Sequence, residues 1–457
     1  MTKRRFSKPE RSWIFYDWAN SAHSTIIVAA IFPIYFATVA KNAGVAGDVW
    51  WGWATSAATF TMAILAPVIG AIGDYKGMKK KLFSAFLLLG LAFTTVMAFA
   101  GDWKLMLVGY AVSYLGWSGA NLFYDSFITD VTTADRMDKV SAWGFSMGYI
   151  GGSTIPFIAS IALVMFGEKI FPAIGLIDKT LSQDEISSSA SVLAVKIAVL
   201  LTVLWWGIFS IPILRNVHQI HFVELPPSRL IKTTFQNIVN TMKHIFHDKA
   251  LFAFIIAYFF YIDGVNSVIH MATAFGASLG LDTTGMILAL LVTQIVAVPC
   301  AIWFSKFAGR IGSINMISIA ILIYFIICIL GFVMGYGIEE EILTIAQAQK
   351  IFWALAVLVG TCQGGIQALS RSFFGKLIPP QRSNEFFGFF DIFGKFAAVL
   401  GPALYAFVKT STGRSSYGIF SIIILFAVGG VVIVVFRKSL RMAETRALES
   451  MERAKQG

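Results

Sequence analysis

Long apolar stretches recur along the chain, each of a length that suits a membrane-spanning helix, and this pattern constrains the fold more than any other feature. A helix needs about 20 apolar residues to cross the hydrocarbon core of a bilayer. Backbone N–H and C=O groups find no water there, so only helices and closed β-barrels are stable. The stretches are too long for barrel strands, which take about 9–11 residues. The sequence therefore predicts an all-α membrane protein with 12 transmembrane helices.

The helices are expected to form two groups of six around a polar segment. The first six are predicted near residues 12–39, 49–73, 82–100, 104–128, 141–167 and 190–214, and the other six near 250–275, 284–305, 314–334, 350–374, 386–409 and 416–437. We expect the polar segment to be a cytoplasmic linker that is partly helical and lies on the membrane. The chain then divides into an N-terminal half (1–214), the linker (215–249), a C-terminal half (250–440) and a cytoplasmic tail (441–457).

Composition agrees with a membrane location and argues against a nucleic-acid partner. The chain is 57% hydrophobic and 13% charged, whereas a globular domain is about one quarter charged. Its net charge of +11 comes from Lys and Arg in short loops and not from one cationic face. These residues are concentrated in loops on one side, so the positive-inside rule places both termini in the cytoplasm. We expect an integral protein of the plasma membrane.

Neither the N-terminus nor the cysteines point to secretion or metal binding. Lys3-Arg4-Arg5 resembles the start of a signal peptide, but the apolar segment that follows is long, carries Asp17 and lacks a clear cleavage site. We therefore expect a retained first helix. The three cysteines lie in apolar segments without metal-site spacing, so we expect packing roles for them and neither a metal nor a cofactor.

An internal repeat relates the two groups of six helices. Asp17-x-x-Asn20-Ser21 in the first helix is echoed 246 residues later by Asp263-x-x-Asn266-Ser267 in the seventh. The same offset relates several residues of helices four and five to residues of helices ten and eleven: Gly119 to Gly365, Ser126 to Ser372, Gly148 to Gly394 and Pro156 to Pro402. Parallel repeats of six helices are the two pseudosymmetric halves of major facilitator transporters. The repeat therefore predicts that fold.

Several motifs give the chain a family resemblance. The loop Gly70-Ala-Ile-Gly-Asp74-Tyr75-Lys-Gly77-Met78-Lys79 resembles the major facilitator signature, although Tyr75 and Met78 stand where Arg is usual. Trp13-Ile-Phe-Tyr-Asp-Trp-Ala-Asn-Ser21, Phe32-Pro-Ile-Tyr-Phe36 and Gly364-Gly-Ile-Gln-Ala-Leu-Ser-Arg-Ser372 resemble the vacuole-effluxer-like branch, related to autophagy-linked amino acid effluxers of fungal vacuoles. The resemblance implies secondary transport, amino acids as the best-known substrates, and export. It also implies that Asp74 stabilises a closed cytoplasmic face by meeting the start of helix eleven, whose dipole favours an anion.

Two polar stripes are candidates for a solute or ion site. Ionisable groups inside membrane helices are costly and need a partner or a watery cavity. Asp17, Asn20 and Ser21 share one face of the first helix, and Asp263, Asn266, Ser267 and His270 share one face of the seventh. The stripes could line one central cavity, and Asp263 and His270 are each candidates for a role in proton coupling. The alternative is that these groups only fix helix packing.

Helices four and ten carry opposite charges at equivalent positions of the repeat, Asp125 and Arg371. We expect a pair that closes an inner gate. Two alternatives are that Arg371 binds a substrate carboxylate with its planar fork, or that it snorkels to the interface. Gln363 and Gln367 on helix ten are further candidates for the solute site.

Helix eleven carries one more charged pair, Asp391 and Lys395, at positions i and i+4. Such a pair neutralises itself on one helix face. The alternative is that either residue contacts the substrate or an ion. We place both with the gating residues.

Together these features predict a monomeric secondary transporter that moves a small polar solute, first choice an amino acid, by alternating access and with proton coupling. Sugars, quaternary amines and lipid-like solutes are the alternative cargoes. A membrane enzyme should display a nucleophile and base or a metal motif, and the sequence contains none. A non-transporting receptor with the same fold is the remaining alternative.

Overall fold

The computed structural model describes residues 5–224, 230–396 and 399–456. Up to the linker the elements are α1 (Lys8–Ala22), η1 (His23–Ala30), α2 (Ile31–Asn42), α3 (Gly47–Gly73), α4 (Met78–Phe99), α5 (Trp103–Ser126), α6 (Ile128–Val131), α7 (Ala134–Gly148), η2 (Tyr149–Thr154), α8 (Ile155–Ala173) and α9 (Gln183–Asn216). The remainder are α10 (Leu230–His247), α11 (Lys249–Ser278), α12 (Thr283–Ile311), α13 (Ser313–Glu339), α14 (Ile345–Leu377), η4 (Pro380–Arg382), α15 (Ser383–Phe396), α16 (Leu400–Thr412), α17 (Ser415–Ser421), α18 (Ile423–Val435) and α19 (Arg437–Gln456).

Eleven helical stretches within the described residues are long and apolar enough to cross a membrane. The helix predicted near 104–128 is present as α5, which has 24 residues. Its Gly, Ser, Tyr and Asn residues make it less apolar than the other eleven. Its 24 residues are nevertheless enough to cross a bilayer, so it is a twelfth helix of sufficient length. The prediction of an all-α membrane protein is confirmed.

Three of the expected helices are not regular throughout. The first span runs over Lys8–Asn42, and its middle, η1, is a π-helix. The span predicted near 141–167 runs over Ala134–Ala173 and contains a second π-helix, η2. The span near 386–409 consists of α15 and α16. Segments of π-helix are rare and occur frequently at functional sites, so η1 and η2 are candidates for parts of a site.

The chain forms two compact units whose limits do not follow the sequence repeat. Unit 1 contains residues 1–65, 77–124 and 147–219, and unit 2 contains residues 66–76, 125–146 and 220–457. Two segments of the predicted N-terminal half therefore pack with the C-terminal half.

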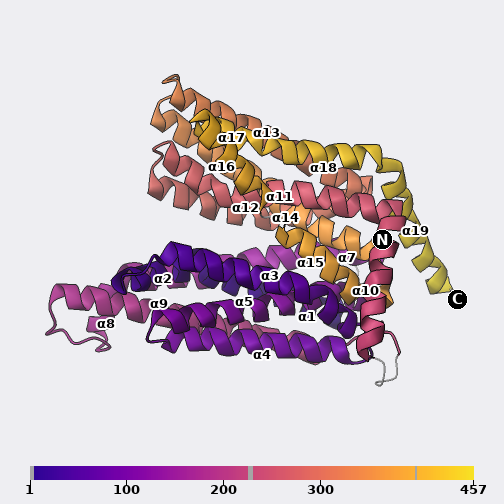
Figure 1. The fold of residues 1–457 in the computed structure, drawn as a ribbon, viewed down its shortest axis with the longest axis horizontal. Coiled ribbons are helices and arrows are strands. Elements are labelled where there is room, and N and C mark those ends of the chain that lie inside the picture. Colours follow the sequence, from indigo (N-terminus) through magenta and orange to yellow (C-terminus); the bar gives the residue numbers. More distant parts are fainter. Residues whose placement is uncertain (1–4, 225–229, 397–398, 457) are drawn as a thin grey trace. The chain divides into compact units, whose positions relative to one another are not determined.

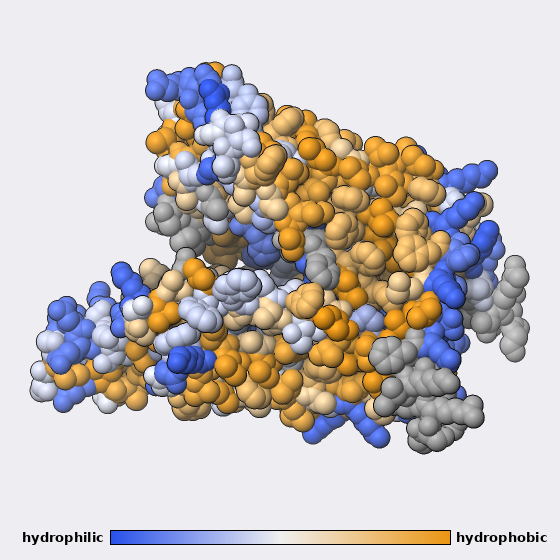
Figure 2. Space-filling view, viewed as in Figure 1, coloured by the Kyte–Doolittle hydropathy of each residue, from blue (hydrophilic) through white to orange (hydrophobic). Residues whose placement is uncertain are grey.

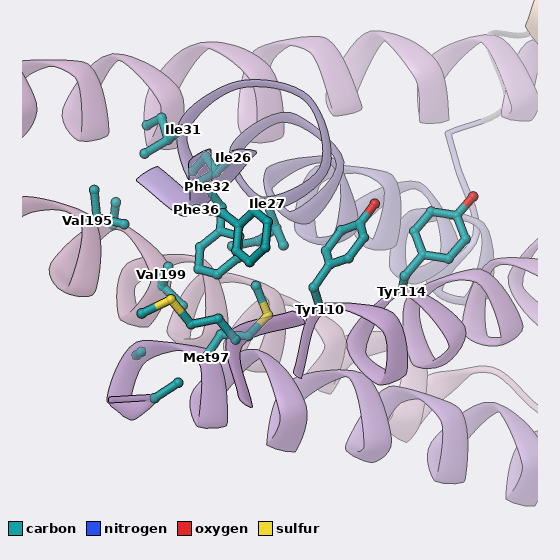
Figure 3. Close-up of a cluster of buried hydrophobic side chains, with 14 of the residues drawn as sticks. Ile26, Ile27, Ile31, Phe32, Phe36, Met97, Tyr110, Tyr114, Val195 and Val199 are labelled. Atoms are coloured by element: carbon teal, nitrogen blue, oxygen red, sulfur yellow. The ribbon is translucent and has the colours of Figure 1, made fainter. Parts of the chain in front are cut away.

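The core of unit 1 is an apolar cluster contributed by five spans (Figure 3). Ile27, Phe32 and Phe36 come from the first span, and they meet Met97 of α4 and Val199 of α9. Each of these side chains is almost completely buried. Because α5 also contributes Tyr110 and Tyr114, the cluster fixes η1 and α2 against α4, α5 and α9.

In unit 2, α12 packs on α14 and α11 packs on α18. Figure 1 shows α10 running across the end of α11, and α19 turning away from the direction of α18. The helix expected within 215–249 is therefore present as α10, while residues 225–229 lie outside the described part of the chain.

The start of the linker is bonded to the loop between α3 and α4 and to α6, all within the same unit. Val223 N–H donates to Asp74 O at 2.8 Å, and Lys76 N–H donates to Val223 O at 3.3 Å. Asp130 Oδ1 accepts from the N–H groups of Ile220 and His221 at 3.0 and 2.9 Å. Because the backbone itself makes these bonds, the linker has a fixed path up to this point.

Candidate functional site

The polar stripe of α1 contacts α5 and η2 within unit 1. Asp17 is buried, and the hydroxyl of Tyr124 donates to its Oδ2 at 2.6 Å. Asn20 Nδ2 donates to Asn121 Oδ1 at 3.0 Å. Ser21 lies against Gly152 so closely that a Cβ at that glycine would stand 2.0 Å from the serine Cβ. The stripe is thus one face, as predicted, and its members hold helices together.

The polar stripe of α11 contacts the start of α16 within unit 2. Asp263 is fully buried, and its Oδ1 accepts from Gly401 N–H at 3.0 Å and from Ser267 Oγ at 3.2 Å. A carboxylate suits this place, because the first N–H groups of a helix lack partners within the helix and carry partial positive charge. Its Oδ2 has no hydrogen-bond partner within the described part of the chain. One oxygen of Asp263 therefore caps α16, and the other makes no hydrogen bond with a described residue.

The other two members of the α11 stripe lie in more open surroundings. Asn266 is half-buried and His270 is exposed. Neither side chain has a hydrogen bond to any described residue, and the proton-coupling role expected of His270 stays a prediction.

A cavity of about 90 Å³ lies inside unit 2. Its wall is mostly apolar, and Gln363 and Gln294 contribute polar groups to it. Gln363 is buried but its amide makes no hydrogen bond with a described residue. Gln367 is half-buried and is not among the lining residues. The structure therefore separates the two glutamines that the sequence grouped together.

The predicted pair of Asp125 and Arg371 is present. Arg371 Nη1 donates to Asp125 Oδ1 at 3.0 Å, and only 5% of the arginine side chain is exposed. Its other nitrogens donate to Ser141, Nε to Oγ at 2.9 Å and Nη2 to the backbone oxygen at 3.1 Å. The guanidinium also lies 4.4 Å from the ring centre of Phe145. These contacts exclude the snorkelling alternative in this structure, because the charge is held inside unit 2.

Asp74 meets the start of helix eleven, as the resemblance implied. Its Oδ1 accepts from the backbone N–H and the side-chain amide of Asn384 at 2.9 and 2.8 Å. Its Oδ2 accepts from Glu385 N–H at 3.0 Å. These residues open α15, so Asp74 caps that helix from the loop between α3 and α4.

The i and i+4 pair on α15, Asp391 and Lys395, forms an ion pair between half-buried side chains. The charges neutralise one another, which is the first of the two interpretations of the sequence. Because each charge has its partner on the same helix, the pair needs no substrate or ion to balance it.

A buried ionic cluster in unit 2 was missed from the sequence. Lys376, whose side chain is 3% exposed, donates to Asp138 Oδ2 at 2.6 Å and to Glu444 Oε1 at 3.3 Å. Ser313 Oγ lies 2.9 Å from both Lys376 Nζ and Asp138 Oδ2. The cluster joins α7, α13, α14 and α19. In the sequence, the only indication of this cluster was a lysine at the end of an apolar helix, and the sequence did not indicate which residues pair with it.

The described residues contain no group of three His, Cys, Asp or Glu side chains that could hold a metal ion. Cys328 and Cys362 are buried and Cys300 is half-buried, and all three are free thiols. What the charged residues do instead is cap helices and join helix ends.

Comparison with known proteins gives relatives along nearly the whole chain. Residues 53–444 match the family described as "Vacuole effluxer Atg22 like". An uncharacterized MFS-type transporter of Bacillus subtilis, YxiO, is 43% identical over 94% of this chain and 95% of its own length. Autophagy-related protein 22-2 of Aspergillus clavatus is 24% identical over 63% of this chain, and the match covers 46% of that protein. The chain thus spans about half the length of such fungal relatives.

Solved structures of major facilitator transporters share the fold. FucP in its outward conformation aligns over 95% of this chain and 98% of its own, with a TM-score of 0.65 and 12% identity. The proton:xylose symporter XylE aligns over 94% of this chain and 95% of its own, with a TM-score of 0.63 and 9% identity. The predicted fold class is confirmed by these likenesses.

Proposed function

The chain belongs to the vacuole effluxer Atg22-like family of major facilitator transporters, and on that premise we propose that it exports amino acids by alternating access, driven by protons. It is an integral membrane transporter and not an enzyme. The specific cargo, direction and coupling belong to the proposal. So do a cytoplasmic position of both termini, a location in the plasma membrane and a monomeric state.

The observation that carries the proposal is the way unit 2 holds the helix ends of the N-terminal half. Three carboxylates from that half, Asp74, Asp125 and Asp138, bind partners in the C-terminal half. By the distribution of Lys and Arg these ends are cytoplasmic. A transporter that opens its site inward must break such bonds and re-form them in each cycle, and a static receptor has no need to.

Arg371 links the gate to the class of cargo. Its charge is buried, so it needs an acceptor in every state of the cycle. When Asp125 withdraws, a solute carboxylate could replace it, since a guanidinium binds carboxylates in a planar fork. This supports amino acids over sugars, which carry no carboxylate.

Asp263 supports proton coupling. It is a buried carboxylate inside a span, and its Oδ2 has no partner among the described residues. Protonation of that oxygen leaves the bond from Gly401 to Oδ1 in place. The site can therefore change charge without losing the cap of α16.

The test is transport by the purified protein in liposomes, with panels of amino acids, sugars and amines. We expect proton-dependent amino acid uptake and counterflow above empty vesicles. Charge reversal at Asp125 or Arg371 alone should lower transport at least tenfold, because one buried charge then lacks its partner. The double swap, D125R with R371D, should recover most of it. Failure of the whole panel would contradict the transport proposal.

The exposed pair of Lys76 and Glu224 provides the matched control for the swap. Their atoms lie 3.2 Å apart, but the side chains are 67% and 74% exposed. Reversal of an exposed pair changes little, because such pairs contribute about 0–1 kcal/mol. Equal losses at both pairs would mean that charge reversal itself damages the protein.

A further inference from the structure

An open groove at the end of the last span is lined by cations and by apolar side chains. It holds about 640 Å³ and runs from the end of α18 along α19. Arg437, Lys438, Arg441 and Arg446 supply four positive charges, against one carboxylate, Glu449. All five side chains are exposed. None of the four cations forms an ion pair with a described residue, although Arg437 Nη2 donates to Asn315 at 2.8 Å.

The other face of α19 is anchored, so the cations are held in place. Leu440 is fully buried, and Glu444 Oε1 accepts from Lys376 Nζ at 3.3 Å and from Ser313 N–H at 3.2 Å. Residues three and four apart lie on one side of a helix. Leu440 and Glu444 are four residues apart and share the anchored side, so the exposed cations lie on the remaining, outward-facing sides of α19.

The apolar part of the groove belongs to the membrane-facing surface. Val434 and Val435, the last residues of α18, are each 69% exposed, and Met442 of α19 is 43% exposed. Figure 2 shows hydrophobic residues over α18 and hydrophilic residues over α19, so the groove lies where the surface changes from one kind to the other. A headgroup beside Arg441 would therefore have its acyl chains beside the valines.

We propose that this groove binds an anionic phospholipid, with its phosphate among Arg437, Lys438, Arg441 and Arg446 and its chains against Val434 and Val435. Basic clusters directly beyond a transmembrane helix attract anionic lipid headgroups. A free anion would leave the valines without a partner, and a lipid without net charge would leave the cations unbalanced. Because we propose a cytoplasmic C-terminus, the lipid belongs to the cytoplasmic leaflet.

The proposal is tested by lipid binding to the delipidated, detergent-solubilised full chain, measured by native mass spectrometry. We expect one site that binds phosphatidylglycerol at least tenfold more tightly than phosphatidylcholine or phosphatidylethanolamine. The variant R441Q/R446Q should weaken phosphatidylglycerol binding about thirtyfold, since each cation near an anionic surface contributes roughly fivefold. R441K/R446K keeps the charge and should keep most of the affinity. This readout needs no transport, so it stands or fails separately from the proposed function.

The control is K8Q/R11Q, which removes two exposed cations from α1 and should leave binding unchanged. Inorganic phosphate at the lipid's concentration should not compete. An equal loss in the control, equal affinity for phosphatidylcholine or phosphatidylethanolamine, or displacement by phosphate would each overturn the proposal. If R441Q/R446Q fails to fold, the comparison of lipids on the unaltered protein and on R441K/R446K still decides it.

Discussion

The two Asp-x-x-Asn-Ser segments carry the same residues at the same spacing, yet they hold different partners. In α1 the carboxylate of Asp17 accepts from a tyrosine hydroxyl of α5. In α11 the carboxylate of Asp263 accepts from the backbone at the start of α16. Part of the difference lies in the fourth helix of each half, because the position equivalent to Tyr124 is Ser370, which bonds to Tyr261 and not to Asp263. Equivalent positions of the repeat therefore keep the same residue types but do not keep the same hydrogen-bond partners.

The largest expected effect is steric, at the glycines that face the two serines. A Cβ at Gly401 would stand 1.7 Å from Ser267 Oγ, and one at Gly152 would stand 2.0 Å from Ser21 Cβ. Gly401→Ala and Gly152→Ala should each lower the free energy of unfolding by about 3 kcal/mol, as overpacking does. Thermal or denaturant unfolding in detergent measures it.

The rescue of these variants separates the two regions. Ser267→Gly removes the atoms nearest to a new Cβ at Gly401, so it should restore part of the stability. At Gly152 the backbone of Ser21 also lies within 2.6 Å of the new Cβ, so Ser21→Gly should not. Equal rescue at both sites would show that the helices can separate in either half.

Asp263→Asn should reduce proton-driven accumulation about a hundredfold, or about 2.7 kcal/mol, and leave counterflow largely intact. Asparagine can still accept from Gly401 N–H and cap α16, but it takes up no proton. Asp17→Asn is the matched variant in the other half and should change accumulation by less than about threefold, since the amide oxygen still accepts from Tyr124. If both activities fall together at Asp263, the residue serves folding or substrate binding and not coupling.

Tyr124→Phe should lower the free energy of unfolding by about 1.5–2 kcal/mol, because a buried oxygen of Asp17 loses this donor. The ring itself stays stacked on Trp13, at a centroid distance of 4.5 Å. The position 246 residues later is Ser370, whose hydroxyl bonds to that of Tyr261 at 2.6 Å. That bond joins two neutral groups, so Ser370→Ala should cost about 1 kcal/mol. A larger loss of unfolding free energy for Ser370→Ala than for Tyr124→Phe would contradict the expectation that the bond to Asp17 is the stronger of the two.

The smallest effect concerns the serines alone. Ser267 Oγ donates to Asp263 at 3.2 Å, whereas Ser21 forms no side-chain hydrogen bond with a described residue. Ser267→Ala should cost about 1 kcal/mol and Ser21→Ala less than about 0.5 kcal/mol. The comparison needs only unfolding midpoints measured side by side.

Features that depend on the chain alone could be predicted from the sequence. The lengths of the apolar stretches gave the helices, and the repeat placed Asp125 opposite Arg371, which the structure joins. The contact of Asp74 with the start of helix eleven could also be predicted. The family resemblance identified the loop that contains Asp74, and the fold fixes the position of that loop.

Features that depend on irregular backbone or on helix ends far apart in sequence could not be predicted. The role of Asp263 as a cap requires that α16 begin at Leu400. Gly401-Pro402 marks a possible helix start in the sequence, but nothing there pairs that start with Asp263. Lys376 finds its carboxylates on α7 and α19, which lie 238 and 68 residues away. Charges at helix ends therefore indicate that ion pairs form, but the packing of the helices determines which residues pair.

Tyr124 and Asp125 are neighbours in α5, and the boundary between the two units falls on the peptide bond that joins them. One side chain bonds to Asp17 in unit 1, and the other bonds to Arg371 in unit 2. Consecutive residues of a helix point about 100° apart around its axis. A rotation of the end of α5 about its axis therefore moves both side chains together. The hydrogen bond of Tyr124 and the ion pair of Asp125 are coupled through this one turn of helix.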